Sequence, residues 1–242
     1  MRYAIISDIH GNIEALEAVL RDAEVQEADE LLCLGDLIGY GADPNECIEA
    51  VRPAASVVIA GNHDWAAVGK LGLEYFNAAA KRAAEWTESV LTAENRRYVQ
   101  RLPLTATVGD DVMLVHSSPS QPEEWMYVFH PGQAARDFSA FEQPFCFIGH
   151  THQPAIFTDN GGFHLGGALD RFRMGVGTRY MVNVGSVGQP RDGNPKAAYC
   201  LFDTEKLTVS IRRVEYDVAR SSMKIVRNKL PRSLAERLPL GL

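Results

Sequence analysis

Five short strand-like runs constrain the fold more than any other feature, because each leads into a side chain that can bind metal. The runs are RYAIIS, ELLCL, SVVIA, VMLV and FCFI, and Asp, Asn or His follows each of them closely. Short apolar runs bounded by turn residues are typical of buried strands. Open α/β sheets place their functional sites at the carboxyl ends of their strands. The sequence therefore predicts an α/β fold in which polar side chains gather at the ends of the strands.

The first third of the chain alternates between strand and helix. After RYAIIS comes NIEALEAVLRDAE, in which Asn12 stands at the N-cap position of an amphipathic helix. ELLCL is followed by a helix with Pro44 in its first turn, where proline is well tolerated. SVVIA then completes a β-α-β-α-β series, which favours a parallel sheet covered by helices.

The rest of the chain indicates a helical insertion, a loop and a strand-rich end. Residues from about 65 to 102 are rich in helix-forming side chains, and LTATVG and DVMLVHS then resemble two strands joined by a Gly-Asp-Asp turn. Residues from about 118 to 132 form a Pro-rich loop that is a candidate lid. Further strand-like runs and a closing helix, DVARSSMKIVRNKL, follow. Because no repeat or linker interrupts the chain, we expect residues 1–242 to form a single domain.

Composition argues against several classes of function. The formal net charge is -7 and the pI is about 5.5, so the chain offers no basic stripe for a stable nucleic acid partner or an anionic membrane. No apolar stretch approaches the roughly 20 residues that a membrane span needs. The four cysteines form no CxxC pair and three lie in strand-like runs, which argues against a structural zinc or a disulfide framework. We expect a cytoplasmic protein.

The carboxylate and imidazole groups at the strand ends suggest a metal centre. Both groups suit manganese, iron, zinc, cobalt or nickel, and the choice among these ions stays open. Seven groups are too many for one ion but suit two ions that share a bridging carboxylate. Two divalent ions outweigh the charge of two aspartates, which leaves room for an anionic phosphate ester. The candidate ligands are Asp8, His10, Asp36, Asn62, His116, His150 and His152.

The order of these motifs resembles a known family. DxHGN, GD, GNHD, a lone His after a strand, and GHTH occur in the order found in the calcineurin-like metallophosphoesterase superfamily, over residues 5–152. NVGSVGQPRDG, at residues 183–193, is similar to the closing loop of its small bacterial and archaeal members. The resemblance implies a four-layer αββα sandwich, in which two mixed sheets lie between helices.

The resemblance also implies a role for each residue. Three of the candidate ligands would hold a first metal, three would hold a second, and Asp36 would bridge them. A bridging hydroxide would attack phosphorus in line, and His63 would face the leaving group as a general acid or as a stabiliser of developing charge. The first triad is Asp8, His10 and His152, and the second is Asn62, His116 and His150.

Two departures from the family pattern bear on the substrate. Ser/Thr phosphatases of this superfamily carry Asp-Arg-Gly shortly after the bridging aspartate, where this chain has Gly39, Tyr40 and Gly41. The aspartate that orients the catalytic histidine is therefore missing, which weakens a protein phosphatase assignment. A related group of small phosphodiesterases replaces the catalytic histidine by cysteine. This chain keeps His63, so both phosphomonoesters and phosphodiesters remain candidate substrates.

These points favour a phosphorylated small molecule or a nucleotide as substrate, including dinucleoside polyphosphates. A Ser/Thr protein phosphatase is the first alternative. A nuclease is a second, against which the acidic pI argues. A third alternative, of another class, is a non-catalytic scaffold that keeps the fold. Such scaffolds usually lose ligands, whereas the ligand set here is complete.

A few further residues are candidates for contact with substrate. Asn12, Tyr40 and Arg191 could bind it, and the guanidinium of Arg191 suits a phosphate group, although Asn12 is already explained as a helix cap. Asp64 fits a turn or cap better than a catalytic role, and we expect His130 and His164 to be ordinary surface or loop residues. Three aromatic residues could form a lid that stacks a base, but packing over the sheet is the preferred interpretation. They are Trp125, Tyr127 and Phe129.

Overall fold

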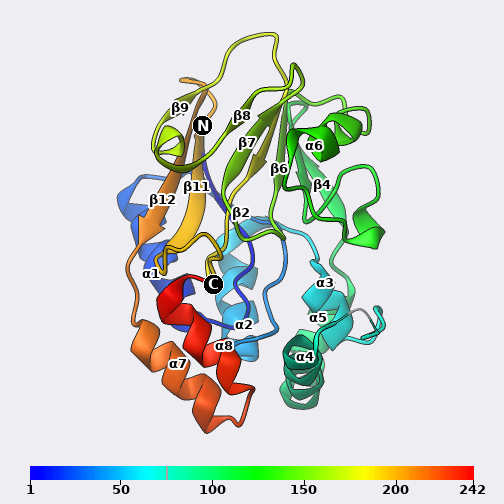
Figure 1. Ribbon diagram of the computed structural model, residues 1–242, viewed down its shortest axis with the longest axis vertical. Coiled ribbons are helices and arrows are strands. Elements are labelled where there is room, and N and C mark those ends of the chain that lie inside the picture. The colour runs from blue at the N-terminus through cyan, green and yellow to red at the C-terminus, as the bar shows by residue number, and fades with distance from the viewer. Residues whose placement is uncertain (75) are drawn as a thin grey trace.

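Two mixed β-sheets form the middle of the structure (Figure 1). The computed structural model describes residues 1–74 and 76–242, and within these residues each sheet has six strands. The first sheet has the order β3-β2-β1-β11-β12-β9, and the second has the order β4-β5-β6-β10-β7-β8.

The first sheet contains the parallel strands predicted from the start of the chain. β1, β2 and β3 run parallel, with α1 (Ile13–Val25) and α2 (Pro44–Ala54) as their crossover helices. β11 continues the sheet by pairing antiparallel with β1. The strands are β1 (Arg2–Ile6), β2 (Glu30–Cys33), β3 (Ala55–Val58), β9 (Phe172–Arg173), β11 (Ala197–Asp203) and β12 (Thr208–Val214).

The second sheet combines a parallel centre with antiparallel flanks. β5 and β10 both run parallel to β6, while β4 and β7 pair antiparallel with β5 and β10. The hairpin of β4 and β5 is the one predicted from the Gly-Asp-Asp turn. The strands are β4 (Thr105–Val108), β5 (Val112–Val115), β6 (Phe145–Ile148), β7 (Ala155–Thr158), β8 (Phe163–His164) and β10 (Tyr180–Asn183).

The two sheets pack face to face through side chains that alternate along the strands. Ile5 of β1 and Leu32 of β2 belong to a buried cluster that also contains Phe147 and Val182 of the second sheet. The neighbours of Ile5 along β1 belong instead to a cluster that includes side chains of α1 and α2. Burying a large apolar side chain stabilises a fold by roughly 1.5–3 kcal/mol, so this double-sided burial fixes the register of the strands.

Helices cover the outer face of each sheet, which gives the four layers that the family resemblance implies. α1 and α2 pack on the first sheet, and α6 (Pro131–Asp137) packs on the second. Asn12 caps α1 as predicted, because its side-chain oxygen accepts a hydrogen bond from the amide of Ala15 at 3.2 Å. The expected αββα sandwich is therefore confirmed.

The helical insertion begins with α3 (Asn62–Ala67), three residues before its predicted start at about residue 65, and continues with α4 (Ala78–Val90) and α5 (Ala93–Gln100). The side chains of Asn77 and Thr92 cap α4 and α5. α3 begins directly after β3, so the first two residues of the helix are the predicted site residues Asn62 and His63. The insertion therefore contributes part of the site.

Two helices end the chain, of which sequence patterning predicted one. α7 (Val218–Arg227) is the predicted closing helix, and α8 (Arg232–Arg237) follows it. Both contribute to a cluster that includes Tyr40 and the α4 residue Ala83, so they lie below the sheets and beside α4 (Figure 1). The short strand β9 was also not predicted. Three 3-10 helices complete the described elements: η1 (Pro122–Glu124), η2 (Gly166–Leu169) and η3 (Leu238–Leu240).

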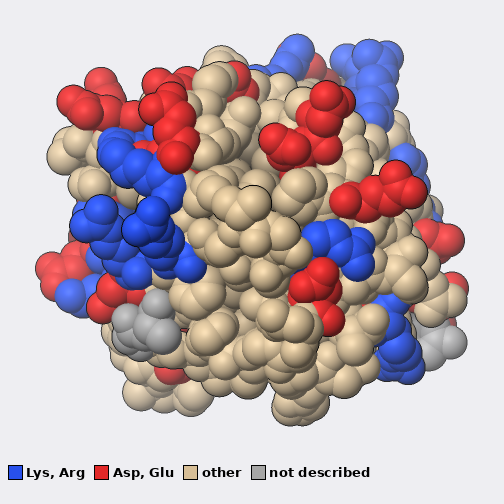
Figure 2. Space-filling model, turned by 90° about the horizontal axis from the view of Figure 1, so that it is seen from above, with Lys and Arg blue, Asp and Glu red and all other residues tan. Residues whose placement is uncertain are grey.

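The surface and the cysteines agree with the expectations from composition. Figure 2 shows Lys and Arg side chains interspersed with Asp and Glu on the face that it presents. All four cysteines are buried and unpaired. In the part of the chain that the structure describes, no helix is both long and apolar enough to cross a membrane.

A carboxylate on α1 ties that helix to the first sheet. Asp22 accepts hydrogen bonds from the hydroxyl of Tyr199 at 2.7 Å and from two guanidinium nitrogens of Arg212 at 3.1 Å. Burial alone would raise the pKa of Asp22, but the hydrogen bonds from Arg212 and Tyr199 outweigh burial and lower the pKa.

We expect Asp22→Asn to lower the free energy of unfolding by about 1 kcal/mol at pH 7. Because the pKa of Asp22 is lower in the folded state, its stabilising effect is present above the unfolded pKa of about 4. The effect is lost as the pH falls through the folded pKa. Urea unfolding at neutral and acidic pH measures this, with the exposed turn variant Asp110→Asn as control. A difference from the parent chain that persists undiminished at acidic pH would contradict the assignment.

Candidate metal centre and active site

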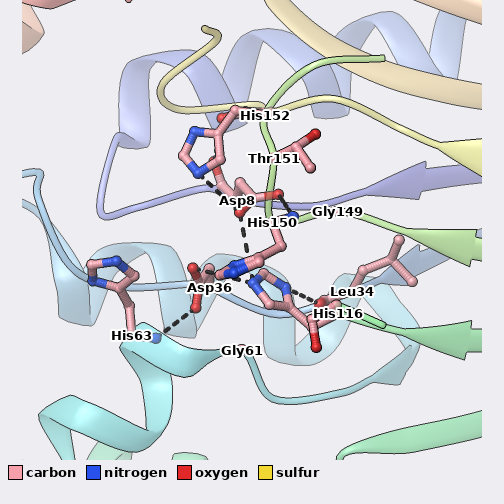
Figure 3. Close-up of polar contacts among 12 residues, drawn as sticks. Asp8, Leu34, Asp36, Gly61, His63, His116, Gly149, His150, Thr151 and His152 are labelled. Atoms are coloured by element: carbon pink, nitrogen blue, oxygen red, sulfur yellow. Dashed lines mark hydrogen bonds and ion pairs between the residues drawn. The ribbon is translucent and has the colours of Figure 1, made fainter. Parts of the chain in front are cut away.

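The strand ends bring six of the seven predicted ligands into one buried cluster, of which Figure 3 labels Asp8, Asp36, His116, His150 and His152. The residues after β1 and β2 approach those after β5 and β6, so the cluster forms where the two sheets meet. Each of the seven side chains is less than 9% exposed. They are Asp8, His10, Asp36, Asn62, His116, His150 and His152.

Six of these residues form two groups whose ligand atoms lie within 4.8 Å of one another. The first group is Asp8, His10 and His152, and the second is Asp36, His116 and His150. Asp36 connects the groups, because its Oδ2 lies 3.6 Å from Nε2 of His10 and 3.4 Å from Nε2 of His116. A third group of ligand atoms joins His10 and Asp36 to His63.

Backbone carbonyls orient three of the histidines. In His10, His116 and His152, Nδ1 faces a carbonyl oxygen. Nδ1 therefore carries the ring proton and donates a hydrogen bond to that oxygen. The lone pair of Nε2 is then free to face the cluster. The carbonyl partners are Ile38 at 3.2 Å, Leu34 at 2.8 Å and Gln189 at 2.5 Å, respectively.

His150 has the opposite tautomer. Its Nε2 lies 2.8 Å from the carbonyl oxygen of Trp125, so Nε2 donates and Nδ1 carries the lone pair. The loop that contains Trp125 therefore sets the orientation of a predicted metal ligand. Sequence reasoning missed all four of these carbonyl groups, because a backbone carbonyl leaves no mark in the sequence.

Several buried atoms of the cluster have no hydrogen-bond partner among the described residues. They include oxygen atoms of both carboxylates and of an amide, and one imidazole nitrogen. A buried polar atom without a partner costs about 1–3 kcal/mol, and more when it is charged, so such atoms are rare unless a ligand or ion satisfies them. The donor set of oxygen and imidazole nitrogen fits a borderline divalent cation. The atoms are Asp8 Oδ1, Asp36 Oδ2, Asn62 Oδ1 and His116 Nε2.

The other oxygen of each carboxylate is held by the backbone of a different element. Oδ2 of Asp8 accepts from the amide of His150 at 3.0 Å, and Oδ1 of Asp36 accepts from the amide of His63 at 2.8 Å. Each carboxylate therefore has one oxygen fixed and one oxygen aimed into the cluster.

The charges of the cluster favour ionised carboxylates beside neutral imidazoles at His150 and His152 and a protonated imidazole at His116. Burial alone would raise the pKa of Asp8 and of Asp36, but the surrounding histidines outweigh burial and hold both pKa values below their ordinary range. Burial lowers the pKa of His150 to about 3 and that of His152 to about 4. Asp36 and Asp8 outweigh the effect of burial at His116, whose pKa rises to about 9. Metal binding requires the neutral imidazole, so a cation in this cluster would replace protons.

The backbone is strained at most of the predicted ligands. Non-glycine residues rarely adopt a left-handed conformation, and such conformations gather at functional sites at a cost on the order of 1–3 kcal/mol each. Five predicted ligands have positive φ angles, which turn the chain sharply at the strand ends. They are Asp8 at 53°, His10 at 51°, Asp36 at 51°, His150 at 66° and His152 at 60°.

Residues from the closing loop and from α7 hold the loop after β1. The amide of Gly188 and the hydroxyl of Ser186 both donate to the carbonyl oxygen of Asp8, at 2.9 and 2.8 Å. A Cβ atom on Gly188 would lie 1.8 Å from the carbonyl oxygen of Ile9, so only glycine fits there. Ser221 of α7 donates to the side-chain oxygen of Asn12 at 2.8 Å.

The amide group of Asn12 is committed to structural contacts. Its oxygen accepts from Ser221 and from the amide of Ala15, and its nitrogen donates to the carbonyl of Gly188 at 2.9 Å. These bonds give Asn12 a structural role. A contact between Asn12 and substrate stays a prediction. Both the oxygen and the nitrogen of its amide already form hydrogen bonds within the protein.

His63 lies beside Asp36 (Figure 3), and its ring also packs against aromatic neighbours. Its ring centroid is 4.4 Å from that of Tyr40 and 5.0 Å from that of Phe76. Nδ1 of His63 has no hydrogen-bond partner within residues 1–74 and 76–242, and a Cβ atom on Gly39 would lie 2.7 Å from it. Gly39 therefore stands against the imidazole, at the position where the protein phosphatase motif has an aspartate.

Tyr40 and Arg191 meet at the edge of the cluster. Nη2 of Arg191 donates to the hydroxyl of Tyr40 at 3.4 Å and to Oε1 of Gln189 at 2.9 Å. The Tyr40 ring also lies 4.6 Å from that of His10. Both residues therefore lie beside the predicted ligands, as a role in substrate binding would require.

Asp64 has the structural position expected of it. Oδ1 accepts from the amides of Leu37 and Ile38, and Oδ2 accepts from the amide of Gly61. These bonds join the loop after β2 to the start of α3. Burial, with Asp36 nearby, raises the pKa of Asp64 to about 8.

The interpretation that the loop aromatics only pack over the sheet is wrong for two of them. Tyr127 is 43% exposed and Phe129 is 37% exposed, because Val128 between them is the side chain that enters the core. The Tyr127 ring stacks on that of His150 at 4.1 Å. Trp125 is half-buried, and its ring lies 5.4 Å from that of Trp65. The loop therefore presents aromatic side chains beside the cluster.

Comparison with known proteins agrees with this geometry. A sequence model of the calcineurin-like phosphoesterase superfamily domain matches residues 1–207. The chain belongs to the calcineurin-like phosphoesterase superfamily. It is a metallophosphoesterase, and the residues of the buried cluster suit the metal dependence of that superfamily.

Three similar proteins match nearly the whole chain. An uncharacterized protein of Methanocaldococcus jannaschii is 42% identical over 241 residues, which are 98% of this chain and 97% of that protein. A metallophosphoesterase from Sphaerobacter thermophilus is 41% identical, with a TM-score of 0.90 over 100% of this chain and 99% of that one. A hypothetical protein from Pyrococcus horikoshii OT3, 24% identical, shares the fold with a TM-score of 0.78 over 98% of this chain and 97% of its own.

Removal of one imidazole tests the metal centre. We expect His116→Ala to retain about one metal ion fewer per chain than the parent, because its Nε2 is one of the buried atoms without a partner. Elemental mass spectrometry of protein purified without chelators measures this, and circular dichroism checks the fold. His130→Ala, an exposed histidine before α6, is the matched control. Equal metal content in all three proteins would refute the role of His116.

Proposed function

We propose that this metallophosphoesterase hydrolyses phosphate esters with two metal ions per chain held at the strand ends. The observation that carries the proposal is that two groups of ligand atoms meet at Asp36. Buried atoms of both groups lack a hydrogen-bond partner among the described residues. Asp8, His10 and His152 would hold one ion, and Asn62, His116 and His150 the other. Asp36 lies within 3.6 Å of both groups and is suited to bridge them.

The ions would supply a Lewis acid for the phosphoryl oxygens and would lower the pKa of a water molecule. The protein's own contribution is to hold the ligands in fixed tautomers and to keep the carboxylates ionised. Manganese, iron, zinc, cobalt and nickel all suit this donor set, so cellular availability selects among them.

His63 is proposed to act on the leaving group. It is buried beside Asp36, yet its Nδ1 forms no hydrogen bond with any described residue. An imidazole at this place can donate a hydrogen bond, or a proton, to the oxygen that leaves phosphorus. Tyr40 and Phe76 fix the plane of its ring through their aromatic contacts.

We expect His63→Ala to keep its metal but to lose turnover by a factor on the order of 10²–10⁴, as is typical for loss of a positioned acid or base. Initial rates with p-nitrophenyl phosphate and Mn²⁺, together with metal analysis, measure both properties. His164→Ala, in β8, serves as the control. Unchanged turnover in the His63 variant would remove the residue from the mechanism.

For the substrate, we favour a small phosphorylated molecule or a nucleotide over a phosphoprotein. The contact between Gly39 and His63 supports this preference, because it occupies the space of the aspartate in the protein phosphatase motif. A panel of p-nitrophenyl phosphate, bis-p-nitrophenyl phosphate, diadenosine polyphosphates and phosphopeptides would rank the classes. Phosphopeptide turnover far above the others would overturn the preference.

A further inference from the structure

A large cavity opens beside the metal centre. Its volume is about 520 Å³, and Asn62, His63 and His150 form the end of it that adjoins the cluster. A cavity of this size can accept a drug-sized organic group. A substrate whose phosphorus lies at the metal centre would therefore direct the rest of its structure into this space.

Two walls of the cavity carry flat apolar side chains. Tyr40 and Phe76 line one side, and Trp125, Met126 and Tyr127 line the other. Met126 is 53% exposed, although large apolar side chains are normally covered by protein. Tyr40 and Phe76 also pack in the cluster with α7 and α8, whereas Met126 and Tyr127 are exposed.

Two lining rings next to the metal centre, those of His150 and Tyr127, belong to a stack of three rings whose third member, Phe129, lies outside the lining. Tyr127 stacks on His150 with 15° between the ring planes, and Phe129 stacks on Tyr127 with 16° between them. The carbonyl of Trp125 holds His150, so the loop and the stack are anchored at the same ring. Because His150 and Phe129 cover the faces of Tyr127, a flat ring of a ligand would meet the edge of Tyr127, an edge-to-face arrangement that aromatic pairs favour. The fixed ring keeps the cost in side-chain ordering small.

The charged side chains on the cavity are acidic. Among the described residues that line it, Glu123 and Glu124 carry charge, and none is Lys or Arg. Arg191 reaches the hydroxyl of Tyr40 but is not part of the lining. A second phosphate group in the cavity would therefore face carboxylates instead of the guanidinium or ammonium groups that normally bind phosphate.

The geometry points to a substrate with a single phosphate and a flat, uncharged aromatic group, such as an aryl phosphate or a nucleoside monophosphate. This inference rests on the proposed function, because it places the phosphate at the metal centre. It also narrows the range of proposed substrates. Dinucleoside polyphosphates are disfavoured, because they would bring further negative charge to the acidic cavity. The aromatic walls would bind the organic group, and the metal centre would bind the phosphate.

Substrate pairs test the aromatic wall. We expect Tyr127→Ala to lower kcat/KM for phenyl phosphate and AMP about tenfold, the size expected for loss of one aromatic contact. Glycerol phosphate, which has no ring, should lose less than about twofold, and Tyr127→Phe should restore the aromatic substrates. Metal content, measured in parallel, shows whether the centre is intact. Equal losses on phenyl phosphate and glycerol phosphate at full metal content would overturn the inference.

A charge reversal tests the acidic rim. We expect Glu124→Lys to raise kcat/KM for ADP and diadenosine tetraphosphate, relative to AMP, about fivefold. Glu24→Lys, an exposed glutamate on α1, makes the same change in net charge away from the cavity and should leave the ratio unchanged. A parent enzyme that prefers the polyphosphates to AMP would refute the inference while leaving phosphoesterase activity established. Absence of turnover on every ester by the metal-loaded parent would instead refute the proposed function.

Discussion

Two buried carboxylates determine how the rest of the site is built. Asp8 and Asp36 lie at the junction of the sheets with almost no exposure to water. An isolated carboxylate in such a place would be very unfavourable, so positive charge or hydrogen-bond donors must surround it. The fold supplies imidazoles from the second sheet and backbone amides from the neighbouring strand ends. The site therefore depends on both sheets. The first sheet provides the two carboxylates, and the second provides imidazoles that surround them.

The strained backbone turns are part of the same arrangement. Asp8, His10 and Asp36 adopt left-handed conformations, and the loops that contain them are cross-linked by main-chain hydrogen bonds. The amide of Asp8 donates to the carbonyl of Gly35, and the amide of His10 donates to that of Asp36. Strain of this kind persists only where the surroundings fix the conformation, and here two adjacent strand ends fix one another.

Much of this could be predicted from the sequence, because its strongest signals are local. The strand ends, the cap at Asn12 and the alternation of strand and helix depend on short runs of residues, and each was predicted correctly. The helix α8 was missed because its amphipathic pattern is only two turns long. The exposed position of Tyr127 could not be predicted, since it depends on the burial of its neighbour Val128 in a core formed by distant strands.

The contacts that orient the histidines of the site could not be predicted from the sequence either. Carbonyl groups such as those of Leu34 and Trp125 hold the histidines, and any residue type can supply a carbonyl. The sequence identified which side chains could bind metal and which motif residues were absent. It could not reveal that Gly39 stands against the ring of His63, because that contact depends on the loop after β2 and the start of α3 meeting in space.

The bonds that hold the loop after β1 have a consequence for the order of folding. Asp8 is fixed by Ser186 and Gly188, and Asn12 is fixed by Ser221, about 180 to 210 positions later in the chain. Contacts of such long sequence separation form late, because the intervening chain must first be brought together. During synthesis the first ligands are made early but acquire their final geometry only after α7 has emerged from the ribosome. An early-made half of the chain would thus lack His150 and His152, and also the serine and glycine contacts that hold Asp8 and Asn12.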